Sequence, residues 1–188
     1  MELIVLLVVL GIVVLIALFV VGLYNGLVQR RLRVDEAWSQ IDVQLKRRHD
    51  LIPNLVNAVR GYMEFEEETL TKVTQARADA VAAGARGPAE QADAENALTG
   101  TLRSLFAVME NYPDLKASQN VMSLQEELST TENQISFSRQ HYNATVRDYN
   151  TAIATVPAVF VAGMFGFTKR DFFEVEDAAR EAPEVQLR

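Results

Sequence analysis

The hydrophobic positions begin as one unbroken block. No charged residue occurs from Leu3 to Val28, and nearly every residue as far as Tyr24 is apolar. About 20 apolar residues in a helix span the ~30 Å hydrocarbon core of a bilayer. A signal peptide, the competing interpretation, has a basic start and an apolar core of roughly 7–15 residues. This block is longer and follows only Met1 and Glu2, so we predict an uncleaved transmembrane anchor.

Beyond the anchor, hydrophobic residues recur every three or four positions, and no segment alternates as a strand would. The first helical piece extends to about Ala83, before a turn at Gly84–Pro88, and the second runs from Pro88 to Asn111. The third has the most regular heptad, with seam positions Val121, Leu124, Leu128, Thr131, Ile135, Ser138, Tyr142, Thr145, Tyr149, Ala152 and Val156. Ser129–Glu132 resembles a capping box, but the unbroken heptad argues against a new helix there. Such a seam is typical of a helix that packs against other helices.

Pro53 lies inside the first piece. An interior proline removes one hydrogen bond and clashes with the carbonyl four residues earlier, at a cost of ~3 kcal/mol. Asp50 offers an alternative, because it could cap a new helix with the proline in its first turn. The apolar stripe nevertheless continues in phase from Leu45 through Ile52 to Val59. We therefore predict one helix that is kinked near Pro53.

These elements predict an all-α protein in which an N-terminal transmembrane helix is followed by an antiparallel, up-and-down bundle of three to four long helices. We divide the chain into an anchor (1–28), a bundle (29–157) and a Phe-rich segment with a polar tail (158–188). The second piece covers only about half of the third, which leaves the stripe Trp38, Ile41 and Leu45 without an obvious cover. An exposed stripe of this kind, on copies confined to one membrane plane, predicts a homo-oligomer.

Basic residues follow the anchor and are absent before it. Arg30, Arg31 and Arg33 come directly after the apolar block. The positive-inside rule then predicts a single-pass protein with a short N-terminus outside and the bundle in the cytoplasm. The three arginines are candidate contacts to anionic lipid headgroups, unless they serve only to set the topology. The net charge of −7 gives no support to nucleic-acid binding, and the absence of cysteine excludes disulfides and thiolate metal sites.

The catalytic candidates are sparse. His49 and Asp50 are neighbours in sequence, and neighbours on a helix point about 100° apart, so they do not form an acid–base pair. The other histidine is His141, and Lys46 and Ser138 stand where a Glu-x-x-His metal motif needs glutamates. No phosphate-binding loop or nucleophile elbow occurs. We predict no catalytic residue, no metal site and no cofactor.

Five of the nine phenylalanines fall within fourteen residues: Phe160, Phe165, Phe167, Phe172 and Phe173. The apolar run around them is too short to span a bilayer. Three interpretations are open: a cover for one end of the bundle, a contact to a neighbouring subunit, or a segment at the membrane surface. We predict these side chains to be partner or oligomer contacts.

Several motifs together resemble the LemA family of bacterial membrane-anchored helical proteins. They are YNGLV (24–28), AWSQIDVQLKRRHDLIPNLVNAVRGY (37–62), YPDLKA (112–117), LQEELSTTENQISFSRQHYNATVRDYN (124–150), and FGF with FFE near the end. The chain departs from the family at Phe65-Glu66, where His-Glu is common, and at Val156-Pro157, where Phe-Pro is common. The resemblance implies a bacterial inner-membrane anchor, an intracellular antiparallel bundle and no established catalytic activity.

Three functions follow as hypotheses. The first is a non-enzymatic membrane scaffold that self-associates or binds partners, with the lipid bilayer as its support. The second, implied only by the resemblance, is an adaptor of a membrane quality-control metalloprotease. The third is an enzyme that uses His49, Asp50 and His141.

Overall fold

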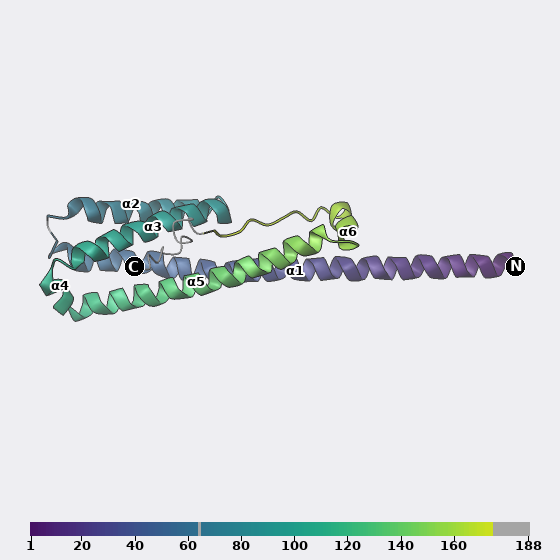
Figure 1. The fold of residues 1–188 in the computed structure, drawn as a ribbon, viewed down its shortest axis with the longest axis horizontal. Helices are drawn as coiled ribbons and strands as arrows, with labels where there is room; N and C mark the ends of the chain where they lie inside the picture. The colour runs from purple at the N-terminus through teal and green to yellow at the C-terminus, as the bar shows by residue number, and fades with distance from the viewer. Residues whose placement is uncertain (64, 175–188) are drawn as a thin grey trace, which may run out of the picture. The chain divides into compact units, whose positions relative to one another are not determined.

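The computed structural model describes residues 1–63 and 65–174 of the chain. Within these residues every regular element is helical, as Figure 1 shows. The helices are α1 (Glu2–Arg60), α2 (Glu67–Ala83), α3 (Pro88–Met109), α4 (Pro113–Ala117), α5 (Gln119–Ala154) and α6 (Ala158–Met164). The predicted all-α fold with long helices is confirmed.

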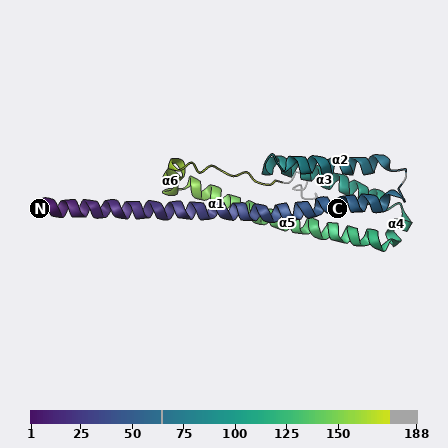
Figure 2. The ribbon, with the colours of Figure 1, turned by 180° about the vertical axis from the view of Figure 1, so that it is seen from behind.

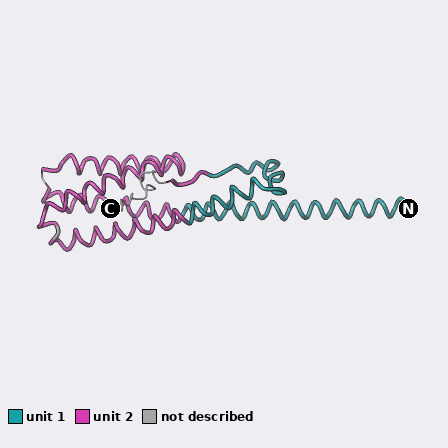
Figure 3. The backbone as a smooth tube through the Cα atoms, viewed as in Figure 1, with its two compact units in different colours: residues 1–39, 141–170 teal, residues 40–140, 171–188 magenta. Residues whose placement is uncertain are grey.

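The chain divides into two compact units, which Figure 3 colours separately. Unit 1 comprises residues 1–39 and 141–170, and unit 2 comprises residues 40–140 and 171–188. Helices α1 and α5 each contribute to both units. The three predicted segments (1–28, 29–157 and 158–188) divide the chain by sequence position, whereas the two units group residues that contact one another. The three segments therefore stay a prediction.

Unit 1 combines the start of α1 with the end of α5 and with α6 (Figures 1 and 2). The rings of Trp38 and Tyr142 lie 5.3 Å apart, and Arg30 pairs with Asp148 at 3.3 Å. From the first contact to the second, the residue number decreases along α1 and increases along α5, so the two helices are antiparallel within unit 1. The apolar stretch of α1 is long enough to cross a membrane, and none of it is buried inside the protein.

Unit 2 contains a hydrophobic core built from α1, α2, α3, α4 and α5. Its buried members are Ile52, Leu55, Val56, Val59, Met63, Leu70, Val73, Ala80, Leu98, Leu102, Leu105, Met109, Leu115, Val121 and Leu128. They recur at helical spacing, so each helix presents one apolar stripe to the core. Full burial of a single aliphatic side chain of this size contributes ~1.5–3 kcal/mol.

The predicted extent of the first helix was wrong. Helix α1 ends at Arg60, and the chain turns through Gly61 before α2 begins at Glu67. Glycine is a poor helix former, and the turn lets the Leu70 and Val73 stripe reach the core, where these side chains are 5% and 0% exposed. A straight rod to Ala83 would have left that stripe without a partner.

The other helical pieces agree with the pattern. Helix α3 begins at Pro88, and α5 continues through Ser129–Glu132 without a break. Pro53 lies inside α1. One continuous helix is therefore confirmed in place of a new helix capped by Asp50, whereas the kink near Pro53 stays a prediction.

The stripe expected to lack a cover is in fact covered. Ile41 and Leu45 are 0% and 1% exposed, and Trp38 is half-buried against Tyr142. The predicted self-association therefore loses the support of this stripe and stays a prediction.

Candidate functional site

A cluster of charged side chains lies inside unit 2, and we call it the buried charge cluster. Arg48 and His49 come from α1, Glu95 and Thr99 from α3, and Glu132 from α5. Arg48 and Glu95 are 1% and 3% exposed. Charges this deep need opposite charges and hydrogen bonds, because transfer out of water costs several kcal/mol per ion.

The Arg48 guanidinium joins three helices. Its Nη2 donates to Glu95 Oε2, and its Nη1 donates to Glu132 Oε2 at 2.5 Å and to Thr99 Oγ1 at 2.9 Å. The other Glu95 oxygen lies 2.8 Å from His49 Nε2. The arrangement fixes the relative register of α1, α3 and α5.

The Glu95 carboxylate is held in its charged form. Burial raises the pKa of Glu95. The hydrogen bond from His49 and the positive charge of Arg48 together lower it by a larger amount, so the net pKa lies below the ordinary 4.5. Both of its oxygens are engaged. A carboxylate with a lowered pKa and no free oxygen is poorly suited to general acid or base catalysis at neutral pH.

A pocket of about 380 Å³ opens beside the cluster. Its lining combines Arg48, Thr99 and Glu132 with the apolar side chains Leu102, Phe106 and Leu128 and the polar side chains Arg103, Gln125, Ser129 and Asn133. Arg48 Nε is buried and has no hydrogen-bond partner among the described residues. The pocket therefore has a mixed lining of charged, polar and apolar side chains.

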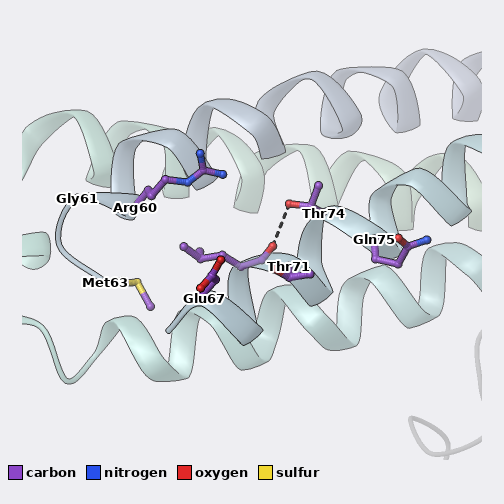
Figure 4. Close-up of a pocket in the computed structure, with 8 residues that line it drawn as sticks. Arg60, Gly61, Met63, Glu67, Thr71, Thr74 and Gln75 are labelled. Carbon is purple, nitrogen blue, oxygen red and sulfur yellow. Dashed lines mark hydrogen bonds between the residues drawn. The ribbon is translucent and has the colours of Figure 1, made fainter. Parts of the chain in front are cut away.

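A second pocket, of about 640 Å³, lies at the turn from α1 to α2 (Figure 4). Arg60 and Glu67 line it together with the hydroxyl residues Thr71 and Thr74. The Thr74 hydroxyl donates to the Leu70 carbonyl at 2.9 Å, as the dashed line in Figure 4 marks. Across the described part of the chain, no group of three or more His, Asp or Glu is placed to hold a metal ion.

The arginines after the anchor lie in unit 1. Arg30 pairs with Asp148, the Arg31 guanidinium lies 5.3 Å from the centre of the Phe167 ring, and Arg33 is exposed. Their contact with lipid headgroups stays a prediction.

The five phenylalanines do not share one environment. Phe160 and Phe165 are 69% and 52% exposed, Phe173 is 2% exposed, and Phe167 and Phe172 are half-buried. The first three in sequence belong to unit 1, and the last two to unit 2. Their role as partner or oligomer contacts stays a prediction.

The residues of the enzyme hypothesis are also dispersed. His49 is 8% exposed and bound to Glu95, whereas Asp50 and His141 are exposed. His49 belongs to unit 2 and His141 to unit 1.

Sequence reasoning missed the partners of Arg48, although a signal for them existed. Arg48 stands at the seam spacing between Leu45 and Ile52, and Glu95 stands at the same spacing between Gln91 and Leu98. Two helices that carry residues of opposite charge at core positions predict a buried ion pair between them.

Comparison with known proteins gives a consistent relationship. The LemA family model matches residues 37–187. Protein LemA of Metamycoplasma hominis is 31% identical over 137 residues, which cover 72% of this chain and 61% of that protein. The magnetosome protein MamQ of Magnetospirillum gryphiswaldense is 25% identical over 179 residues, which cover 82% of this chain and 66% of that protein. The chain thus spans slightly less than two thirds of the length of these relatives. From the family match and the helical fold that carries the same motifs, we conclude that the chain belongs to the LemA family.

Proposed function

We propose that this chain is a non-enzymatic, membrane-anchored helical scaffold that self-associates, or binds protein partners, at the inner face of a bacterial cell membrane. The observation that carries the proposal is the continuity of α1. One helix of 59 residues begins in the unburied apolar stretch and ends in the packed core of unit 2. A flexible linker would separate anchor and bundle, whereas a continuous helix joins them mechanically.

The buried charge cluster supports a structural role. Its carboxylates and guanidinium are engaged with one another across three helices. Buried ionic pairs of this kind are best attested as devices that fix register. The cluster thus helps to hold the bundle in one arrangement for a partner to recognise.

Two exposed hydrophobic side chains of unit 2 support the proposed contact with a second copy. Val43 on α1 is 63% exposed and Phe137 on α5 is 76% exposed. Phe137 lines a pocket of about 350 Å³ with Gln44, Thr130, Asn133, Gln134 and Ser138. Gln44 Oε1 is buried without a partner among the described residues. A copy of the same surface would supply an aromatic ring to cover Phe137, and the bilayer holds all copies in one orientation.

The test is the mass of the full-length protein in mild detergent, measured by light scattering. We expect a dimer or larger particle, and we expect Phe137→Ser to shift it toward the monomer. Val81→Ser is the matched control, because Val81 on α2 is likewise exposed, at 51%, and lies outside this pocket.

A monodisperse wild-type monomer would exclude self-association. If a membrane metalloprotease copurified in fixed ratio with that monomer, the adaptor function would replace the scaffold that we propose. Hydrolytic activity that His49→Ala abolished, with the helical spectrum intact, would instead establish an enzyme.

A further inference from the structure

Helix α6 presents an apolar face to its surroundings. Phe160 and Met164 are 69% and 77% exposed and, four residues apart, lie on the same face of the helix. Phe165 follows at 52% exposed. We call these three residues the α6 patch. A contiguous apolar surface of this kind on a folded protein needs an occupant.

The α6 patch is attached to the end of the anchor. The Phe165 and Phe167 rings lie 4.9 and 5.7 Å from the ring of Tyr24 on α1. The apolar residues before Tyr24 span roughly 30 Å as a helix, the thickness of the hydrocarbon core. Burial by other parts of unit 1 also begins here, because Leu27 is 1% exposed whereas Val21 is 54% exposed. Tyr24 is thus at the level where the bilayer ends, and it places the α6 patch there too.

The other face of α6 is packed and the following segment is bonded to unit 1. Val161 and Ala162 are 5% and 3% exposed. The Tyr149 hydroxyl donates to the Thr168 carbonyl at 3.0 Å, and Arg170 pairs with Asp35 at 2.8 Å. These contacts determine which face of α6 points outward. The exposed phenylalanine and methionine therefore belong to a built surface rather than to a loose end.

Cationic side chains occur in the same unit as the α6 patch. The Arg31 guanidinium lies over the Phe167 ring, and Arg33 and Lys169 are exposed. Bulky apolar side chains beside lysine and arginine are the composition of segments that lie in the headgroup region and insert their apolar face at the acyl boundary. Each cationic side chain near the surface also gains from anionic lipid.

We propose that the α6 patch is embedded in the interface of the same bilayer that α1 crosses, as a second membrane contact beside the anchor. The occupant is lipid rather than a second copy, because the α6 patch is continuous with the apolar surface of α1 at the membrane boundary. The proposal rests on the membrane anchoring within the proposed function and is independent of self-association.

The test uses the full-length chain, which has no cysteine. A nitroxide is attached at Met164→Cys, and the protein is reconstituted in vesicles of phosphatidylethanolamine and phosphatidylglycerol. Oxygen, which concentrates in the bilayer, and a water-soluble nickel chelate are then added to separate samples. The relaxation of the label by each reagent is measured and compared. We expect Met164→Cys to be relaxed severalfold more by oxygen than by the chelate.

Two positions on α1 calibrate the depth scale. Leu15→Cys lies in the middle of the apolar stretch, and Ser39→Cys is exposed and lies about 22 Å beyond Tyr24 along the helix. We expect position 164 to report a depth between the two. Accessibility to the chelate equal to that at position 39 would overturn the proposal. A label that is shielded from both reagents would also overturn the proposal, if its spectrum is broadened and dilution with unlabelled protein removes the broadening. A second copy would then cover the α6 patch.

The outcomes separate this inference from the scaffold. A water-exposed label on protein that still floats with the vesicles overturns the lipid contact and leaves the anchor. Protein that does not float overturns both. Circular dichroism of each labelled variant checks that the helices are retained.

Discussion

At the scale of single residues, Arg48 shows how one charge can organise three helices. It takes a position that the seam of α1 would give to an aliphatic side chain, and it is 1% exposed. Glu95 provides the deep counter-charge, while the Glu132 side chain is 45% exposed. Because the two carboxylates differ so much in exposure, we expect them to differ in their contribution to stability.

Replacement of the deep partner should be costly. We expect Glu95→Gln to lower the free energy of unfolding by about 3–5 kcal/mol, because Arg48 would keep a buried charge without full compensation. Glu132→Gln, at the more exposed position, should cost less than half as much. Urea unfolding in detergent, followed by circular dichroism, measures both.

The double variant Arg48→Met/Glu95→Leu distinguishes charge from packing. It should recover much of the loss, because apolar side chains of similar volume can replace a buried ion pair with little penalty. A double variant as unstable as the Glu95→Gln single variant would show that packing, rather than the unpaired charge, caused the loss.

The same pair predicts a pH dependence. The pKa of Glu95 is lower in the folded protein than its ordinary 4.5, so the folded state binds this proton more weakly than the unfolded chain does. Its contribution is complete above pH 4.5 and is lost as the pH falls through the folded-state pKa. We expect the stability difference between wild type and Glu95→Gln to shrink below pH 4.5. A difference that stayed constant between pH 7 and pH 3 would contradict the assignment.

At the scale of elements, helix ends were harder to predict than helix faces. The proline that begins α3 and the heptad of α5 as far as Ala152 agree with the sequence pattern, whereas the last predicted seam position, Val156, is 76% exposed and lies beyond the end of α5. The end of α1 was not predicted correctly, because its apolar stripe continues past Gly61 into α2. An apolar stripe predicts which residues are buried in a core. It does not predict whether the chain continues straight or turns back to bury them.

Pro53 tests how α1 is shaped. We expect Pro53→Ala to restore a backbone hydrogen bond, to straighten α1 and to raise the free energy of unfolding by up to about 3 kcal/mol. Spin labels at Val43→Cys and Arg60→Cys, both on the part of α1 that belongs to unit 2, should move apart. Unchanged distances would show that α1 is already straight at the proline.

At the scale of the whole molecule, the charges beside the apolar helix predict the topology in the membrane. We expect Glu2→Cys to react with a membrane-impermeant maleimide on intact bacterial cells, and Ser39→Cys to react only after lysis. The reverse pattern would place the bundle outside. Neither substitution touches the buried charge cluster, so the unfolded fraction should match that of wild type.

The fold class, the long apolar N-terminal helix and the family were determined by the sequence alone, because each depends on periodicity or on a run of residues that local composition displays. The long heptad of α5 leaves little alternative to a helix that packs on others. The helix likewise fixes an angle of about 100° between the neighbours His49 and Asp50, so the sequence alone argues against a pair between them.

Only the tertiary structure decided which distant residues meet. Arg48 and Glu95 are 47 residues apart, and no local rule connects two seam positions on different helices. The same holds for Tyr24 and Phe165, whose contact brings α6 to the end of the anchor. Such contacts depend on where α1 ends and the chain turns back, and that turn is decided by the burial of a whole stripe rather than by the preference of any residue within it.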